Sequence, residues 1–136
     1  MTQAPTLHHL GGEQFVLLTT YRRSGEPVPT PVWVLPDAGG AVVSTPAGAG
    51  KVKRVRRDPR VTLQACDRRG RVQEGAPVVE GTTEVITDSA ASEAVNRRLQ
   101  RKYGLEFRIF MAVEWILKRG NSTRIVLRIT PLAPRG

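Results

Sequence analysis

The hydrophobic residues of this chain fall into short blocks separated by turn-forming residues. Blocks rich in β-branched and aromatic residues cover residues 15–21, 28–35 and 41–45, and glycines and prolines stand between them. Such blocks are typical of strands. Three further blocks at residues 60–66, 76–87 and 122–130 have the same character. The pattern therefore predicts about six strands, and short strands with frequent turn signals favour an antiparallel barrel over a βαβ fold.

Prolines recur at every second position around the second block, at Pro27, Pro29 and Pro31. Alternate residues of a strand direct their N–H groups to the same edge, so all three missing donors fall on one side. That side cannot form a normal hydrogen-bonded ladder. We therefore expect it to face a bulge, the edge of the sheet or a ligand.

Two longer helices are predicted before the last strand. Asp88 can cap a helix over residues 89–103, and Gly104 can end it. Apolar residues at i, i+4 spacing form a stripe along it, namely Ala91, Val95, Leu99 and Tyr103. The next segment, residues 105–120, is apolar on more than one face and needs cover on both sides. In a chain this short, a second subunit is the expected cover.

The most basic segment is GKVKRVRRDPRV, residues 50–61, which holds six basic residues and one acidic residue. Val52 and Val55 are three positions apart, which fits a short helix that lies on the sheet with its cations outward. Pro59 ends this helix, because the residue before a proline disfavours helical geometry.

These elements predict a mainly β, α+β chain that forms a single domain over residues 1–136. No run of 18 apolar residues predicts a membrane-spanning helix, and the first residues lack the pattern of a secretory signal. With Cys66 as the single cysteine, no internal disulfide can form. We therefore expect a cytoplasmic protein that does not bind a membrane.

The net charge of +9 predicts an anionic partner, and nucleic acid, an acidic membrane surface and a polyanionic cofactor all fit. Few aromatic residues interleave with the cations and no helix-turn-helix pattern is present, so specific nucleic-acid binding is not expected. His8 and His9 are adjacent and lack companions at metal-ligand spacing, so no metal site is expected. No nucleophile-elbow sequence surrounds any serine. If the chain is an enzyme, a cofactor therefore carries the chemistry.

The glycines do not form a dinucleotide fingerprint or a Walker motif. Phosphate binding would instead use Lys51, Lys53 and Arg54, together with hydroxyl and N–H groups of residues 44–50.

Three stretches together, TPVWVL, STPAGAGKVKRVRRDPRVTL and CDRRGR, resemble the flavin and deazaflavin oxidoreductases of the pyridoxamine-phosphate-oxidase class. The similarity covers residues 15–129 and is greatest to the branch that uses the deazaflavin coenzyme F(420). The resemblance implies an FMN-binding-like split β-barrel, with a short basic helix and a helical excursion before the last strand. It also implies a homodimer with two cofactor sites at the subunit interface.

The resemblance further implies which residues hold the cofactor. Lys51 matches the family's phosphate-binding lysine, and Ser44 and Thr45 match contacts to the phosphate or the ribityl chain. Arg54 stands where relatives often carry Asn. The strand that lies along the tricyclic ring matches Thr30, Pro31, Val32 and Trp33, of which Val32 and Trp33 could form an apolar wall. The acidic groups of the deazaflavin could meet Lys51, Lys53, Arg54, Arg56 and Arg57.

We therefore expect an F(420)-dependent oxidoreductase that transfers a hydride to a conjugated small molecule. Two alternatives remain open: an FMN-binding oxidoreductase of the same fold, and a carrier or sensor that binds a ligand without turnover. Because Trp residues on strands more often serve as core or interface, contact between Trp33 and the ring is only one interpretation. Arg68, Arg69 and Arg71 are expected to form a solvated turn.

Overall fold

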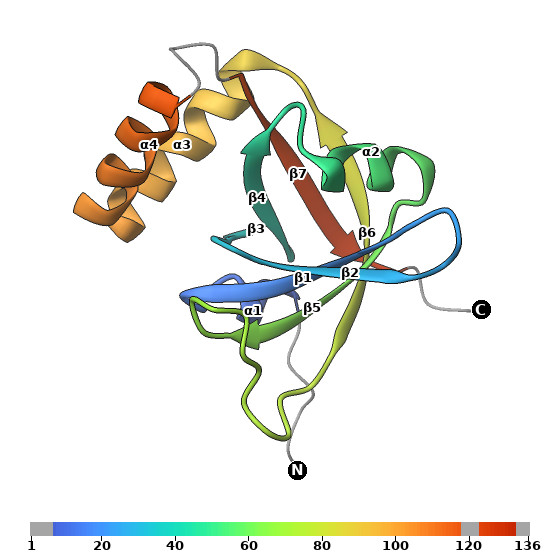
Figure 1. The fold of residues 1–136 in the computed structure, drawn as a ribbon. Helices are drawn as coiled ribbons and strands as arrows, with labels where there is room; N and C mark the ends of the chain where they lie inside the picture. The colour runs from blue at the N-terminus through green and yellow to red at the C-terminus, as the bar shows by residue number, and fades with distance from the viewer. Residues whose placement is uncertain (1–6, 118–122, 133–136) are drawn as a thin grey trace.

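The computed structural model describes residues 7–117 and 123–132, which fold around one seven-stranded sheet (Figure 1). The strand order is β2-β1-β5-β6-β7-β4-β3, and every neighbouring pair is antiparallel. The expected mainly β class with antiparallel strands is thus confirmed. The strands are β1 (Phe15–Tyr21), β2 (Pro27–Val32), β3 (Leu35–Asp37), β4 (Gly40–Pro46), β5 (Arg60–Cys66), β6 (Val79–Ile86) and β7 (Arg124–Pro131).

The predicted strand over residues 28–35 is divided in two, which accounts for the seventh strand. β2 ends at Val32 and β3 begins at Leu35. Between them, the backbone of Val34 bonds to a helix instead of a strand, because its N–H donates to Tyr103 Oη at 3.1 Å and its carbonyl accepts from Lys102 Nζ at 2.7 Å. These bonds satisfy buried polar groups that a continuous strand would have paired within the sheet.

β2 lies at one edge of the sheet and pairs with β1 alone. An edge position is one of the three alternatives that the alternating prolines predicted, since an edge strand leaves one row of backbone groups without ladder partners. Prolines along such a row also block the addition of a further strand.

In the described part of the chain, four helices accompany the sheet: α1 (Leu7–Leu10), α2 (Gly50–Arg57), α3 (Ser89–Tyr103) and α4 (Leu105–Leu117). The predicted limits of α3 are confirmed at both ends. Asp88 Oδ2 accepts a hydrogen bond from the N–H of Ala91 at 3.0 Å, and Gly104 ends the helix with a φ of 59°. Residues 118–120 of the predicted second helix, and residue 122 of the last predicted strand, lie outside the described residues.

The core has two parts, one inside the curved sheet and one beneath α3 and α4. Strands β4 and β7 contribute to both, because their side chains are buried on each face. Val43 and Leu127 point into the first part, whereas Val42 and Val126 pack against the helices. The helical stripe is seen as Val95, Leu99 and Tyr103 in the second part, joined by Phe107 of α4.

α4 leaves much of its apolar surface uncovered, as its sequence predicted. Phe107 and Glu114 are its buried residues, while seven apolar side chains are 47–77% exposed. The exposed set is Leu105, Ile109, Phe110, Val113, Trp115, Ile116 and Leu117. Among the helices within residues 7–117 and 123–132, none combines the length and hydrophobicity that a membrane crossing needs.

Candidate functional site

Helix α2 carries the basic segment and packs on β1 and β6 (Figure 1). Val52 and Val55 are buried beneath it, as their spacing predicted. The chain enters α2 from the end of β4 through a turn in which the N–H of Ala49 donates to the carbonyl of Pro46 at 3.1 Å. This entry places the first turn of α2 beside the last residues of β4.

Lys51 reaches back from α2 to the end of β4. Its Nζ donates to Thr45 Oγ1 at 3.4 Å, and the Thr45 side chain is buried. Burial lowers the pKa of Lys51, and the charges of Arg124 and Arg54 lower it further. An anion beside this ammonium would offset both effects, so the local electrostatics favour an anionic ligand.

Arg54 lies one helical turn further along and is bound to β1. Its Nε donates to Thr20 Oγ1 at 2.6 Å, and burial together with the charges of Arg22 and Arg57 lowers its pKa. Arg57 Nη2 donates to the carbonyl of Tyr21 at 2.6 Å, whereas Lys53 points to solvent. Sequence reasoning missed Arg22, which follows β1 in YRRSG; its only signal was a basic pair in a turn.

The cations of α2 have no carboxylate partner in an ion pair among the described residues. Asp58, the acidic residue of the segment, binds Arg60 at 3.1 Å. No ion pair within the described ranges involves Lys51, Arg54 or Arg57. A polyanion, such as a cofactor with a phosphate and several carboxylates, fits this row of unpaired cations.

Ser44 and Thr45 lie where the phosphate contacts were expected, but Ser44 is engaged by other residues. Its hydroxyl donates to Asn96 Oδ1 at 3.2 Å and accepts from Arg124 Nε at 2.9 Å, while its carbonyl accepts from Arg124 Nη2 at 3.0 Å. In this arrangement the Ser44 hydroxyl has no proton left to donate to a phosphate. Sequence reasoning missed Asn96 and Arg124. Arg124 meets Ser44 because β7 pairs with β4, and Asn96 reaches the same hydroxyl from α3.

The four residues expected along the ring differ in how far their side chains are exposed. Val32 belongs to the core inside the sheet, so its side chain is not available as the predicted apolar wall. Thr30 and Trp33 are half-buried, and Pro31 is exposed on the edge strand. The backbone of this strand can still lie along a ring, because no strand of the described residues pairs with the second side of β2.

Trp33 is held by aromatic side chains of α3 and α4. Its ring stacks on Tyr103 with a centroid distance of 4.9 Å and meets the edge of Phe110 at the same distance. The Tyr103 hydroxyl donates to the carbonyl of Gln14 at 2.7 Å, which fixes the ring beneath Trp33. Trp33 therefore packs against the core beneath α3 and α4 and also lines a neighbouring cavity.

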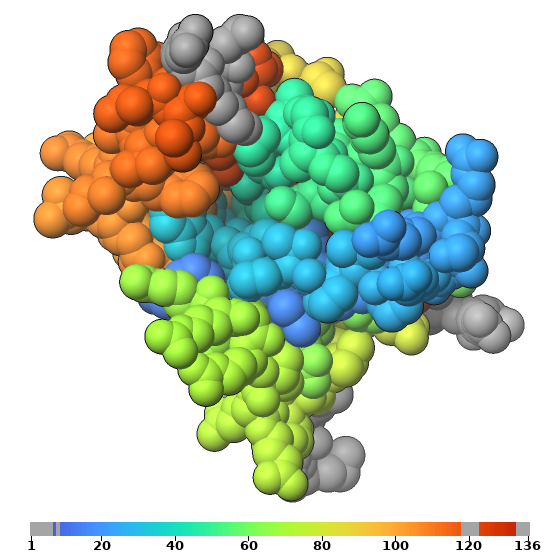
Figure 2. Space-filling model, viewed as in Figure 1, coloured from blue at the N-terminus to red at the C-terminus, as the bar shows by residue number. Residues whose placement is uncertain are grey.

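That cavity, which we call the α4 cavity, lies between α4, the end of β2 and the turn after β5. It has a volume of about 720 Å³. In Figure 2, α4 (orange) and the segment after β5 (yellow-green) approach each other beside β2 (cyan). Its lining is mainly apolar and consists of Phe15, Pro31, Trp33, Arg68, Leu105, Glu106, Ile109, Phe110 and Val113.

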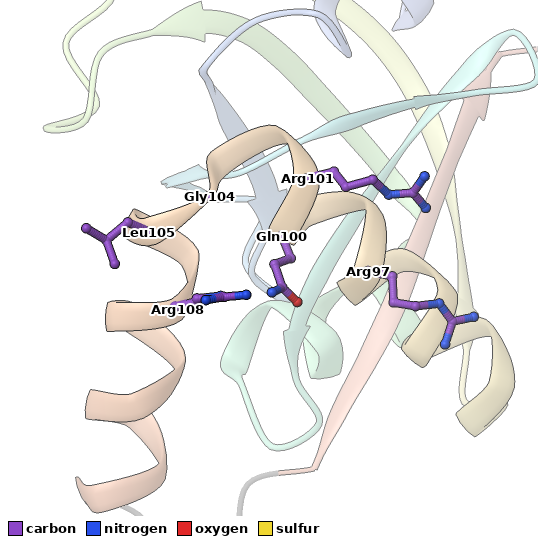
Figure 3. A pocket seen from close by; sticks show the side chains of 6 residues that line it. All are labelled: Arg97, Gln100, Arg101, Gly104, Leu105 and Arg108. Atoms are coloured by element: carbon purple, nitrogen blue, oxygen red, sulfur yellow. The ribbon is translucent and has the colours of Figure 1, made fainter.

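A second hollow of about 540 Å³ lies between α3 and α4 and is lined by three arginines. Figure 3 shows Arg97 and Arg101 extending away from Arg108, which points toward Gln100. Because the guanidinium groups do not converge, this hollow is a weaker candidate for anion binding than the basic helix. Nowhere in the described part of the chain do three or more His, Cys, Asp or Glu side chains gather as potential metal ligands.

Comparison with known proteins identifies the family. The sequence profile of the pyridoxamine 5'-phosphate oxidase family matches residues 7–134. The chain belongs to this family. Among curated proteins, none matches the sequence significantly.

Solved structures share the fold at low sequence identity. An F(420) reductase is 16% identical, with 97% of each chain covered and a TM-score of 0.65. The heme storage protein HutZ of Vibrio cholerae is 13% identical, with 92% of this chain and 86% of that chain covered and a TM-score of 0.65. A FAD-binding protein of Mesorhizobium loti is 18% identical over 91% and 85% of the two chains, with a TM-score of 0.57. These similarities confirm the expected split-barrel fold.

Proposed function

We propose that this family member is an oxidoreductase that uses the deazaflavin coenzyme F(420) and transfers a hydride to a conjugated small molecule. The observation that carries the proposal is the row of cations formed by Lys51, Arg54, Arg57 and Arg22, without carboxylate partners among the described residues. The F(420) reductase among the structural relatives supports the choice of cofactor.

The number of cations favours the deazaflavin over FMN. FMN carries one phosphate, whereas the deazaflavin coenzyme carries a phosphate, a lactyl carboxylate and an oligoglutamate tail. Lys51, beside Thr45, is the proposed phosphate ligand. Arg54, Arg57 and Arg22 then line the path of the carboxylates, with Lys53 on the solvent side, and each charge-assisted contact is stronger than a neutral one.

The protein's remaining tasks are to orient the ring and to exclude water. We assign the ring to the backbone of residues 30–33, at the end of the edge strand β2, where the prolines block other strands. When bound, the reduced deazaflavin supplies a hydride from ring carbon five, and the acceptor gains this hydride and one proton. Residues 30–33 contain no acidic side chain, so we assign solvent as the source of this proton.

We further propose that the protein works as a cytoplasmic homodimer. Seven apolar side chains of α4 are exposed in the single chain, and a contiguous patch of this kind marks an interaction surface. A second copy would cover this helix and close the cofactor groove from outside, which would keep water away from the ring.

The test is a titration followed by turnover. The protein is titrated with F(420) and with FMN, and binding is followed by intrinsic tryptophan fluorescence. The cofactor that binds more tightly is then reduced and mixed, together with the protein, with quinones and other conjugated carbonyl compounds. The proposal predicts tighter binding of F(420) and oxidation of the reduced coenzyme by at least one acceptor. Tighter binding of FMN would favour the flavin alternative, and tight binding without oxidation would favour a carrier.

A further inference from the structure

We propose that the α4 cavity binds a flat, largely apolar molecule that carries an acidic group at one end. In the proposed reaction this molecule would be the hydride acceptor, and that assignment rests on the proposed function. The binding site itself rests on the side chains that line the cavity.

The size and the aromatic lining of the cavity suit a flat apolar ligand. Its volume of about 720 Å³ is in the range of small-molecule pockets. Three aromatic rings, those of Phe15, Trp33 and Phe110, line it together with Pro31 and Ile109. Aromatic rings pack most favourably against other planar groups in offset or edge-to-face arrangements.

The aromatic wall is formed before any ligand arrives. Trp33 stacks on Tyr103 at an interplanar angle of 23°, and Phe110 meets it at 64°. Lys102 adds a further anchor, because its Nζ donates to the carbonyl of Val34 next to Trp33. A wall held in this way loses little conformational freedom on binding, which favours affinity.

One end of the cavity carries a charged pair that can recognise an acid. Arg68 Nη2 lies 2.7 Å from Glu106 Oε1, and the guanidinium lies 5.9 Å from the centre of the Phe15 ring. The Arg68 side chain is 74% exposed, and an exposed ion pair of this kind contributes little stability. A ligand carboxylate can therefore replace Glu106 as the partner of Arg68 while the rest of the ligand lies on the aromatic wall.

The cavity also lies next to the proposed ring site. Pro31 and Trp33 line the cavity, and both belong to the segment assigned to the cofactor ring. A ligand in the cavity would thus lie beside the ring, as an acceptor must. The second copy of the proposed dimer has to leave this cavity open, because Ile109 and Val113 belong both to the lining and to the exposed α4 surface. A second copy that fills the cavity is the competing occupant.

Two probes that differ by one acidic group test this inference in the protein without cofactor. The acidic probe is 8-anilinonaphthalene-1-sulfonate, and its uncharged counterpart is N-phenyl-1-naphthylamine; both are followed by their own fluorescence. Arg68→Gln should weaken binding of the acidic probe by about fivefold, whereas binding of the uncharged probe should not change. Glu106→Gln should strengthen binding of the acidic probe by about twofold or more.

A second pair of variants locates the probes. Ile109→Asp places a charge in the cavity and should abolish binding of both probes. Val78→Asp changes an equally exposed apolar residue that lies outside α4 and does not line the cavity, and it should leave both affinities unchanged. Circular dichroism checks that each variant is folded.

Three results would overturn the inference. The first is an equal effect of Arg68→Gln on both probes, and the second is binding that survives Ile109→Asp. The third is probe binding that disappears as the protein concentration rises, which would show that a second copy fills the cavity. The probe measurements are made without cofactor, so they do not test F(420) binding. Likewise, a failure of F(420) to bind would refute the proposed function but not the binding of the probes.

Discussion

Arg124 and Glu114 form a buried ion pair that joins the last strand to α4. Arg124 Nη1 lies 2.6 Å from Glu114 Oε2, and each side chain is 8% exposed. Arg124 also holds the hydroxyl and the carbonyl of Ser44, so one guanidinium connects α4 to the end of β4. Arg124 thus links α4, the helix with the exposed apolar surface, to the candidate phosphate site.

Removal of Glu114 should therefore destabilise the fold strongly. Glu114→Ala leaves the buried Arg124 guanidinium without this carboxylate, which is expected to lower the free energy of unfolding by about 3 kcal/mol. Glu106→Ala, which breaks the exposed pair with Arg68, is the matched control and should cost about 1 kcal/mol or less. Urea unfolding followed by circular dichroism measures both. Equal losses in the two variants would contradict a special role of the buried pair.

Tyr103→Phe tests the anchor beneath Trp33. The change removes the donor to the Gln14 carbonyl and leaves the Val34 N–H without its acceptor, so we expect a loss of about 1–3 kcal/mol in the free energy of unfolding. Tyr21→Phe serves as control, because no hydrogen bond found in the described structure involves the Tyr21 hydroxyl. A loss no greater than that of the control would show that the Tyr103 hydroxyl adds no stability.

The same hydroxyl predicts a pH dependence. Burial raises the pKa of Tyr103 to about 12, whereas a tyrosine in an unfolded chain titrates near 10. Between these values the folded state keeps a proton that the unfolded state has lost. The stability that Tyr103 contributes is thus fully present below about pH 10 and is lost as the pH rises toward 12. Unfolding measured from pH 9 to pH 12 should show a smaller decline in Tyr103→Phe than in the wild type.

Lys51→Met should stabilise the protein while it weakens anion binding. Burial of the ammonium beside Arg124 and Arg54 opposes folding, as the lowered pKa of Lys51 indicates, and its hydrogen bond to Thr45 is long. We expect a gain of about 1 kcal/mol in the free energy of unfolding. Lys53→Met, at an exposed position of the same helix, should change stability little. A loss of stability in Lys51→Met would show that Lys51 serves the fold itself.

Ile116→Glu tests the proposed dimer. Ile116 is 65% exposed on α4, and a buried carboxylate at an apolar interface would carry a large desolvation cost. Sedimentation equilibrium should show the wild type as a dimer and the variant as a monomer. Val78→Glu changes a comparably exposed apolar residue away from α4 and should leave the dimer intact. A wild-type protein that stays monomeric at high concentration would refute the proposal.

Local patterns in the sequence predicted most of the fold. The limits of β1, β5 and α3 agree with the prediction, because each is set by nearby residues such as Asp88 and Gly104. The division of the segment after Pro27 was not predicted. It depends on Tyr103 and Lys102, which are about 70 positions away in the chain and replace the sheet as hydrogen-bond partners of Val34.

The candidate site was predicted only where its residues are neighbours in sequence. Lys51 and Thr45 are six positions apart, and the structure brings them together as expected. Arg124 and Asn96 come from distant elements and meet Ser44 through strand pairing and helix packing. The Val32 side chain could not be placed from alternation alone, since the pattern does not say which face of an edge strand meets the core.

The central claim is that Lys51 and Arg54 hold the acidic part of F(420), and one titration tests it most directly. The affinity of Lys51→Ala/Arg54→Ala for F(420) is measured by tryptophan fluorescence beside that of Arg69→Ala/Arg71→Ala, which removes two charges from the turn after β5. The account predicts binding that is about tenfold weaker or more in the first variant and unchanged in the second. Unchanged affinity in Lys51→Ala/Arg54→Ala, with the fold intact, would contradict the assigned site.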